Sequence, residues 1–129
     1  MNAWDSLPNA KHIDWVLADM RDHHNDWAAA RAAARAAACD AAWDAAWAAA
    51  RAAAWDSAWD AVRDAARDAA RDAAWREVRA ACAALIAWDE SAELLDMPPD
   101  AVKLLASVGN RMAMLMYPAV LVKSNRSKS

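Results

Sequence analysis

A repeat of four residues governs the pattern of large and small side chains from Trp27 to Arg79. Every fourth position carries Trp or Arg, except Cys39, and most positions between are Ala or Asp. The leading residues are, in order, Trp27, Arg31, Arg35, Cys39, Trp43, Trp47, Arg51, Trp55, Trp59, Arg63, Arg67, Arg71, Trp75 and Arg79. A period of four is close to the α-helical turn and far from the two-residue period of a strand, so the repeat predicts helix.

On one continuous helix, each step of four residues turns the leading position by about 40° beyond a full circle. With Trp27 as the origin, most Arg side chains then lie at nearby angles and form a polar arc. The remaining, broader arc holds Trp43, Trp47, Trp55, Trp59 and Trp75, which makes the helix amphipathic. Asp–Arg pairs three residues apart, such as Asp60 with Arg63, are expected to lie side by side on its surface.

The Trp arc contains the candidate binding site. Its members are Trp43, Trp47, Arg51, Trp55, Trp59, Asp40 and Asp44. The Trp pairs at four-residue spacing are expected to stack, and Arg51 is expected to stack on a ring. The two Asp residues and Arg51 must find partners or remain in contact with water, because burying an unpaired charge is costly. The sequence leaves open whether these rings are core or binding surface.

The fold class predicted is all-α: a short N-terminal helix, a long Ala/Trp-rich helix with the four-residue repeat, and a compact C-terminal helical cap. Between Pro8 and Pro98 there is no Gly or Pro. A continuous helix from Trp27 to about Met97 would be on the order of 100 Å long, too long for the terminal pieces to cover. Two alternatives remain: the helix pairs with copies of itself, or it breaks at points such as Asp56-Ser57 and folds back.

The chain is predicted to form a single domain, 1–129, in four segments. Residues 1–26 form the first helix and a turn, with Ser6 as N-cap and Asp26 capping the next helix. Residues 27–84 are the repeat, and 85–122 form Leu/Met-rich helices. The latter include a start at Met97-Pro98-Pro99, a stop at Gly109, and a last helix from about 111 to 122 kinked at Pro118. Residues 123–129 are expected to be a flexible tail.

Composition limits the function classes. The chain has nine Trp and no Phe, and its net charge is only −3. Within residues 27–84, Arg and acidic residues are equal in number. A nucleic-acid binder normally carries a basic face of one sign, and neither sign dominates here. Because Ala buries little surface, Trp must supply much of the apolar surface that is buried on folding.

Catalytic and metal chemistry finds weak support, so we expect no enzyme activity and no cofactor. A cluster with metal-binding side chains contains His12, His23, His24, Asp19, Asp22 and Asp26. Asp19 and His23 have a workable spacing for two ligands, but no third partner follows at a defined spacing. Cys39 and Cys82 are expected to be inert thiols within Ala-rich helix. The single Gly rules out a phosphate-binding glycine-rich loop.

The expected location is the cytoplasm. Two cysteines do not make a disulfide framework, and the N-terminus lacks the pattern of a signal peptide. The apolar run 112–122 is too short to span a bilayer, so no membrane association is expected.

A resemblance adds context. The repeat units, the segment Ala84-Leu85-Ile86-Ala87-Trp88-Asp89 and the following Leu94-Leu95-Asp96-Met97-Pro98 resemble small Ala/Trp/Asp/Arg-repeat proteins of bacteria, phages and prophages, some described as immunity proteins. The resemblance implies an accessory factor that acts in conflict between phage and host, as an inhibitor or an immunity or anti-defence protein. It brings no catalytic residues.

The function expected is therefore non-enzymatic binding of a host or phage protein through the Trp-bearing surface, with self-association into a homo-oligomer. Two alternatives stay open. One is a nucleotide- or nucleic-acid-sequestering protein that uses Trp stacking and Arg. The other is a purely structural homo-oligomer.

Overall fold

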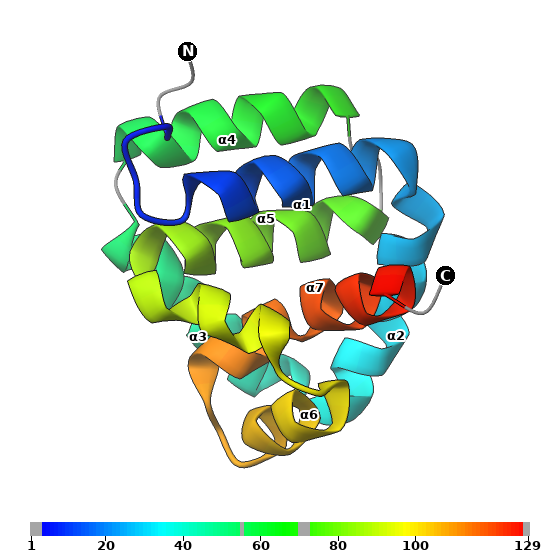
Figure 1. The fold of residues 1–129 in the computed structure, drawn as a ribbon. Helices are drawn as coiled ribbons and strands as arrows, with labels where there is room; N and C mark the ends of the chain where they lie inside the picture. The colour runs from blue at the N-terminus through cyan, green and yellow to red at the C-terminus, as the bar shows by residue number, and fades with distance from the viewer. Residues whose placement is uncertain (1–3, 55, 70–72, 128–129) are drawn as a thin grey trace.

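The structure is a computed structural model that describes residues 4–54, 56–69 and 73–127. These residues form α-helices and one 3-10 helix, with no strand among them, which confirms the all-α class (Figure 1). The elements are α1 (Ala10–Asp22), α2 (His24–Ala37), α3 (Asp40–Ala53), α4 (Asp56–Ala69), α5 (Ala73–Ala87), η1 (Asp89–Asp96), α6 (Pro99–Ser107) and α7 (Arg111–Ser127).

The repeat segment is divided among α2, α3, α4 and α5, so the chain folds back. The first break lies at Ala38 and Cys39 and the second at Ala54, all three with extended backbone angles. No Gly or Pro marks these breaks. Asp40 and Asp56 are the first residues of the next helices. The break predicted at Asp56-Ser57 is thus found immediately before Asp56.

A longer repeat of 16 residues underlies the four-residue one. Helices α2, α3 and α4 begin at residues 24, 40 and 56, at a constant spacing. Trp27, Trp43 and Trp59 are therefore the fourth residue of three successive helices, and all three are buried. Three residues further on, the equivalent positions Ala30, Ala46 and Val62 are also buried. Each of these helices thus turns the same kind of face inward.

The two-arc prediction is wrong for Trp27. On a continuous helix Trp27 lies at nearly the same angle as Arg31 and Arg67, yet it is fully buried in α2. The angles cannot be summed along residues 27–79, because each break resets the direction of the helix axis.

Helices α5 and α7 lie at the centre of the molecule. Helix α5 packs against α1, α2, α3, α4, α7 and η1, and α7 packs against α2, α3, α5, α6 and η1. Figure 1 shows α4, α1 and α5 side by side, with α7 crossing below them and α6 at the opposite end. The run 80–84 of α5 is fully buried and mostly Ala, which allows neighbouring helices to approach closely.

The N-terminal helix ends at Asp22 as predicted, but its cap is Asn9 instead of Ser6. The Asn9 side-chain amide is buried and donates hydrogen bonds to the carbonyl oxygens of Leu85 and Asp89, both at 3.0 Å. Helix α2 begins after His23, so the prediction that Asp26 caps it is also wrong. Asp26 lies one turn inside, where its carboxylate is available to a distant partner.

The C-terminal half follows the sequence closely up to Val122. Pro98 caps α6, and Gly109 has the left-handed φ of 97° expected at a helix stop. The eight-residue 3-10 helix η1 was not predicted. Helix α7 continues through Pro118 and past Val122 to Ser127, so the predicted flexible tail is wrong for 123–127. Ion pairs hold these last turns, as described below.

Candidate functional site

Three Trp rings of the predicted site form one cluster between α3 and α4. Trp43 and Trp47 are stacked, with ring centroids 6.2 Å apart and planes at 12°, as their four-residue spacing predicts. Trp47 meets Trp59 edge to face, with centroids 5.4 Å apart. Such pairs are favourable beyond the area they bury. The fold therefore brings Trp47 and Trp59 together across a helix break that the sequence does not mark clearly.

Two guanidinium groups cover the faces of these rings. Arg51 lies over Trp59 at 5.0 Å from the ring centroid, which confirms the predicted stacking of Arg51. Arg79, from α5, lies over Trp47 at 4.7 Å. Arg51 Nη1 is buried and has no hydrogen-bond partner among the described residues, so the ring is its main contact. Both cations thus remain stacked within the protein.

Burial shows that the cluster belongs to the interior. Trp43 and Trp59 are only 5% and 3% exposed, and Trp47 is half-buried. Of the predicted site residues, Trp43, Trp47, Arg51 and Trp59 come together, whereas Asp44 is exposed. The side chains of Asp40, Trp55 and Trp75 lie outside the described residues. The geometry favours packing over a binding surface for this cluster.

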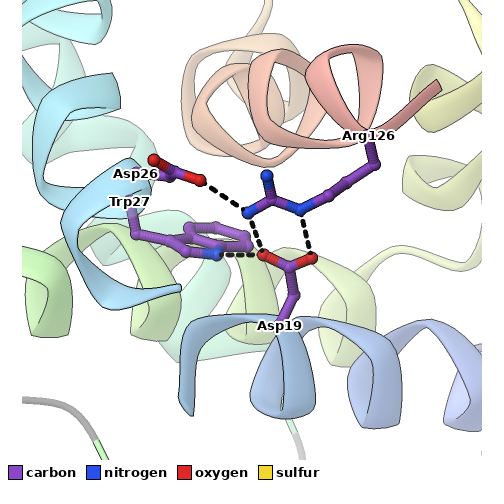
Figure 2. A network of polar contacts seen from close by, with 4 residues as sticks. All are labelled: Asp19, Asp26, Trp27 and Arg126. Carbon is purple, nitrogen blue, oxygen red and sulfur yellow. Dashed lines mark hydrogen bonds and ion pairs between the residues drawn. The ribbon is translucent and has the colours of Figure 1, made fainter. Parts of the chain in front are cut away.

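A second cluster joins the ends of three helices (Figure 2). Arg126 near the end of α7 donates from Nε and Nη2 to the two carboxylate oxygens of Asp19 in α1, both at 2.9 Å. Arg126 Nη2 also donates to Asp26 of α2 at 2.8 Å, and Trp27 Nε1 donates to Asp19 at 3.1 Å. Bidentate pairs of this kind are the stronger ion pairs in proteins.

The protonation of Asp19 follows from these contacts. Burial acts to raise its pKa, but the hydrogen bonds from Arg126 and Trp27, together with nearby positive charge, outweigh burial and lower the pKa. The hydrogen bond with Asp19 in turn raises the pKa of Arg126 above its ordinary value. Asp19, considered above as a metal ligand, is instead engaged by Arg126. Among the described residues, no group of three or more His, Cys, Asp or Glu side chains is arranged to hold a metal ion.

Glu77 in α5 is a buried acid that the sequence reading missed. It is almost fully buried, and its Oε1 lies 3.8 Å from Nε of the partly exposed Arg31 in α2. A signal was present, because Glu77 is the only Glu in 27–84, where every other acid is Asp. On the surface, the predicted pair of Arg63 with Asp60 is present at 3.7 Å and well exposed, so it contributes little.

The two cysteines have different surroundings. Cys82 is fully buried in α5, and burial raises the pKa of its thiol, which keeps it protonated and unreactive. Cys39 is exposed at the break before α3, so its predicted place inside a helix is wrong.

Of the surface hollows in the described part of the chain, two bear on ligand or partner binding. One, of about 340 Å³, is a groove between α2 and α6 lined by Ala36, Ala37, Asp100, Lys103, Leu104 and Ser107. Leu104 of this lining and Val108, which follows Ser107, are the exposed large hydrophobic residues of the described chain, at 64% and 72%. The other, also of about 340 Å³, is a cleft lined by Trp88, Glu90, Gly109, Asn110, Arg111 and Met112.

A comparison of the chain with known protein families, curated proteins and solved structures finds no match. Within the part of the chain that the structure describes, no helix combines the length and the apolar character needed to traverse a bilayer.

Proposed function

We propose that this protein is a non-enzymatic helical binding protein that contacts a protein partner through the exposed face of α6. The observation that carries the proposal is the exposure of Leu104 and Val108 beside the groove between α2 and α6. Large apolar side chains in contact with water beside a hollow mark interaction sites more often than single scattered ones do.

The side chains that line the groove indicate which kind of protein segment it binds. Ala36 and Ala37 are small and leave room for an inserted side chain, while Asp100 and Lys103 place opposite charges at the same hollow. A matching partner presents an apolar anchor residue flanked by one basic and one acidic residue, as helix-in-groove ligands do. Charges of both signs favour a mixed-charge protein segment over a nucleic acid or another ligand of one sign.

The resemblance to phage and bacterial repeat proteins supports a partner from phage or host and an inhibitory or immunity role in the cytoplasm. Helices α2 and α6, which line the groove, are held in place by packing on α7 and on each other. Nucleotide stacking has less support, because Arg79 and Arg51 already lie over Trp47 and Trp59. Binding a base on those faces would require the loss of both stacking contacts.

The test places a photo-crosslinking amino acid at Leu104 and, as a control, at the exposed Ala48 of α3. We expect crosslinks in cells to one protein from position 104 and none to it from position 48. The crosslinked protein, once purified, should bind Leu104→Asp about tenfold or more weakly than wild type. The free energy of unfolding should change by no more than about 0.5 kcal/mol, because Leu104 is exposed.

Unchanged affinity of Leu104→Asp would remove α6 as the binding face. Crosslinks from position 104 only to other copies of the chain would instead support the structural homo-oligomer.

A further inference from the structure

The cleft between η1 and the start of α7 is separate from both the Trp cluster and the α6 groove. Its walls include the half-buried Trp88, which precedes η1, and Glu90 within it. Gly109 and Asn110, just before α7, and Arg111 and Met112, its first two residues, complete the cleft. Its volume of about 340 Å³ suits a small ligand.

Two opposite charges line this cleft without meeting. Among the described residues, neither Glu90 nor Arg111 forms an ion pair within 4.0 Å or a side-chain hydrogen bond. The Arg111 guanidinium is held over the Trp88 ring, 5.4 Å from its centroid. A carboxylate and a guanidinium that share a hollow but do not contact each other can be bridged by a ligand that carries both complementary charges.

The backbone adds donors at the Arg111 end. Asn110 accepts the N–H of Ala113 with its side-chain Oδ1 at 3.0 Å and the N–H of Met114 with its backbone oxygen at 3.1 Å. The N–H groups of Arg111 and Met112 have no acceptor among the described residues. Together with the guanidinium they favour a carboxylate at this end of α7.

The remaining walls are apolar. The Trp88 ring and the Met112 side chain offer surface to a hydrocarbon group. Glu90 disfavours a doubly charged phosphate, because like charges would share the cleft, and it favours an ammonium group.

We propose that this cleft binds a small amino-carboxylate, an α-amino acid with an apolar side chain. Its carboxylate contacts Arg111 and the first N–H groups of α7, and its ammonium group contacts Glu90. Its side chain packs on Met112 and on the part of Trp88 that lines the cleft beside the Arg111 guanidinium, so the stacking of Arg111 on Trp88 is kept. The proposal is independent of protein binding through α6.

The experiment titrates the full-length protein with L-leucine by calorimetry and by ¹H–¹⁵N NMR, in which Trp88→Phe identifies the indole resonance of Trp88. We expect a dissociation constant on the order of 1 mM or lower, with shifts of the Trp88 indole and of the Arg111 and Met112 amides. N-acetyl-L-leucine lacks the ammonium charge and L-leucinamide lacks the carboxylate. Each should bind about tenfold or more weakly, because one charge-assisted contact is lost.

Variants complete the test. Glu90→Gln and Arg111→Gln should each weaken L-leucine binding about tenfold or more. The matched controls Glu93→Gln, from the exposed side of η1, and Lys11→Gln, from exposed α1, should not change it. Leu104→Asp should also leave it unchanged, which separates this site from the α6 face.

No heat and no shift of these resonances at 10-fold the expected dissociation constant would overturn the proposal. So would equal binding of L-leucine, N-acetyl-L-leucine and inorganic phosphate, since a plain anion site would then explain the cleft. Unchanged affinity of both Glu90→Gln and Arg111→Gln would overturn it as well.

Discussion

Asp19 shows how a single residue gains its role from distant parts of the chain. In sequence it lies four residues before His23, a spacing that two metal ligands can share. In the structure its carboxylate receives hydrogen bonds from Trp27 and from Arg126, which is 107 residues away. Spacing along the chain indicates only nearby partners such as His23, so it could not indicate the contact with Arg126.

The lowered pKa of Asp19 predicts how stability depends on pH. Because the folded pKa lies below the unfolded one, the ionised carboxylate stabilises the fold above its ordinary pKa of 3.8. That contribution is lost as the pH falls through the lower, folded value. The free energy of unfolding of wild type should therefore decrease on acidification below about pH 4 more steeply than that of Asp19→Asn.

Urea unfolding between pH 7 and pH 2 measures this difference. At pH 7, Asp19→Asn should be less stable by about 1–3 kcal/mol, because Arg126 loses a charged acceptor. Asp22→Asn, at an exposed position of the same helix, is the control and should follow wild type. Parallel pH curves for wild type and Asp19→Asn would contradict the assigned role.

At the scale of helices, the structural repeat from α2 to α4 is 16 residues long, and each repeat contains four of the four-residue sequence units. Trp27, Trp43 and Trp59 occupy equivalent buried positions in α2, α3 and α4. The equal spacing of these Trp residues is visible in the sequence, but the four-residue repeat also produces it on one continuous helix. Only the breaks at Ala38 and Ala54 give the longer spacing a structural meaning.

Because Trp43 and Trp59 occupy equivalent buried positions in α3 and α4, replacing either one should lower the free energy of unfolding by a similar amount. Trp43→Ala and Trp59→Ala should each lower the free energy of unfolding by about 3–5 kcal/mol, because each removes a buried ring. Trp47→Ala should lower the free energy of unfolding by less, because Trp47 is only half-buried. The exposed control Asp44→Ala should change it by no more than about 0.5 kcal/mol. Denaturant titration followed by circular dichroism measures these values. Near-wild-type stability of Trp59→Ala would show that the ring is not core.

At the scale of the whole molecule, folding back changes what the Trp residues require. A continuous helix would leave a Trp arc that one chain cannot cover, which was the reason to expect self-association. With α2, α3 and α4 packed against α5, the chain itself covers Trp43 and Trp59. Self-association therefore stays a prediction, but it no longer follows from an uncovered Trp surface.

Small-angle scattering tests this compact arrangement. A globular monomer of 129 residues should have a radius of gyration of about 14 Å. A rod built on a helix on the order of 100 Å long would give roughly twice that value. A dilution series separates a larger radius caused by association from one caused by an extended chain. An extended monomer would contradict the fold.

Sequence alone determined the secondary structure class and several of the helix starts and stops. Ala-rich four-residue periodicity has only a helical solution, Gly109 supplies the left-handed stop, and Trp43 stacks on Trp47 within one helix at four-residue spacing. These features depend on residues close together in the chain, whose relative positions the helix fixes.

Tertiary structure alone decided which Trp faces are covered, that Asp19 is held by Arg126, and that Leu104 and Val108 remain in water. The physical reason is that Ala forms helix readily but buries little surface, so no local preference fixes where the helix breaks. Those breaks are set by the packing of helices from distant parts of the chain around α5 and α7.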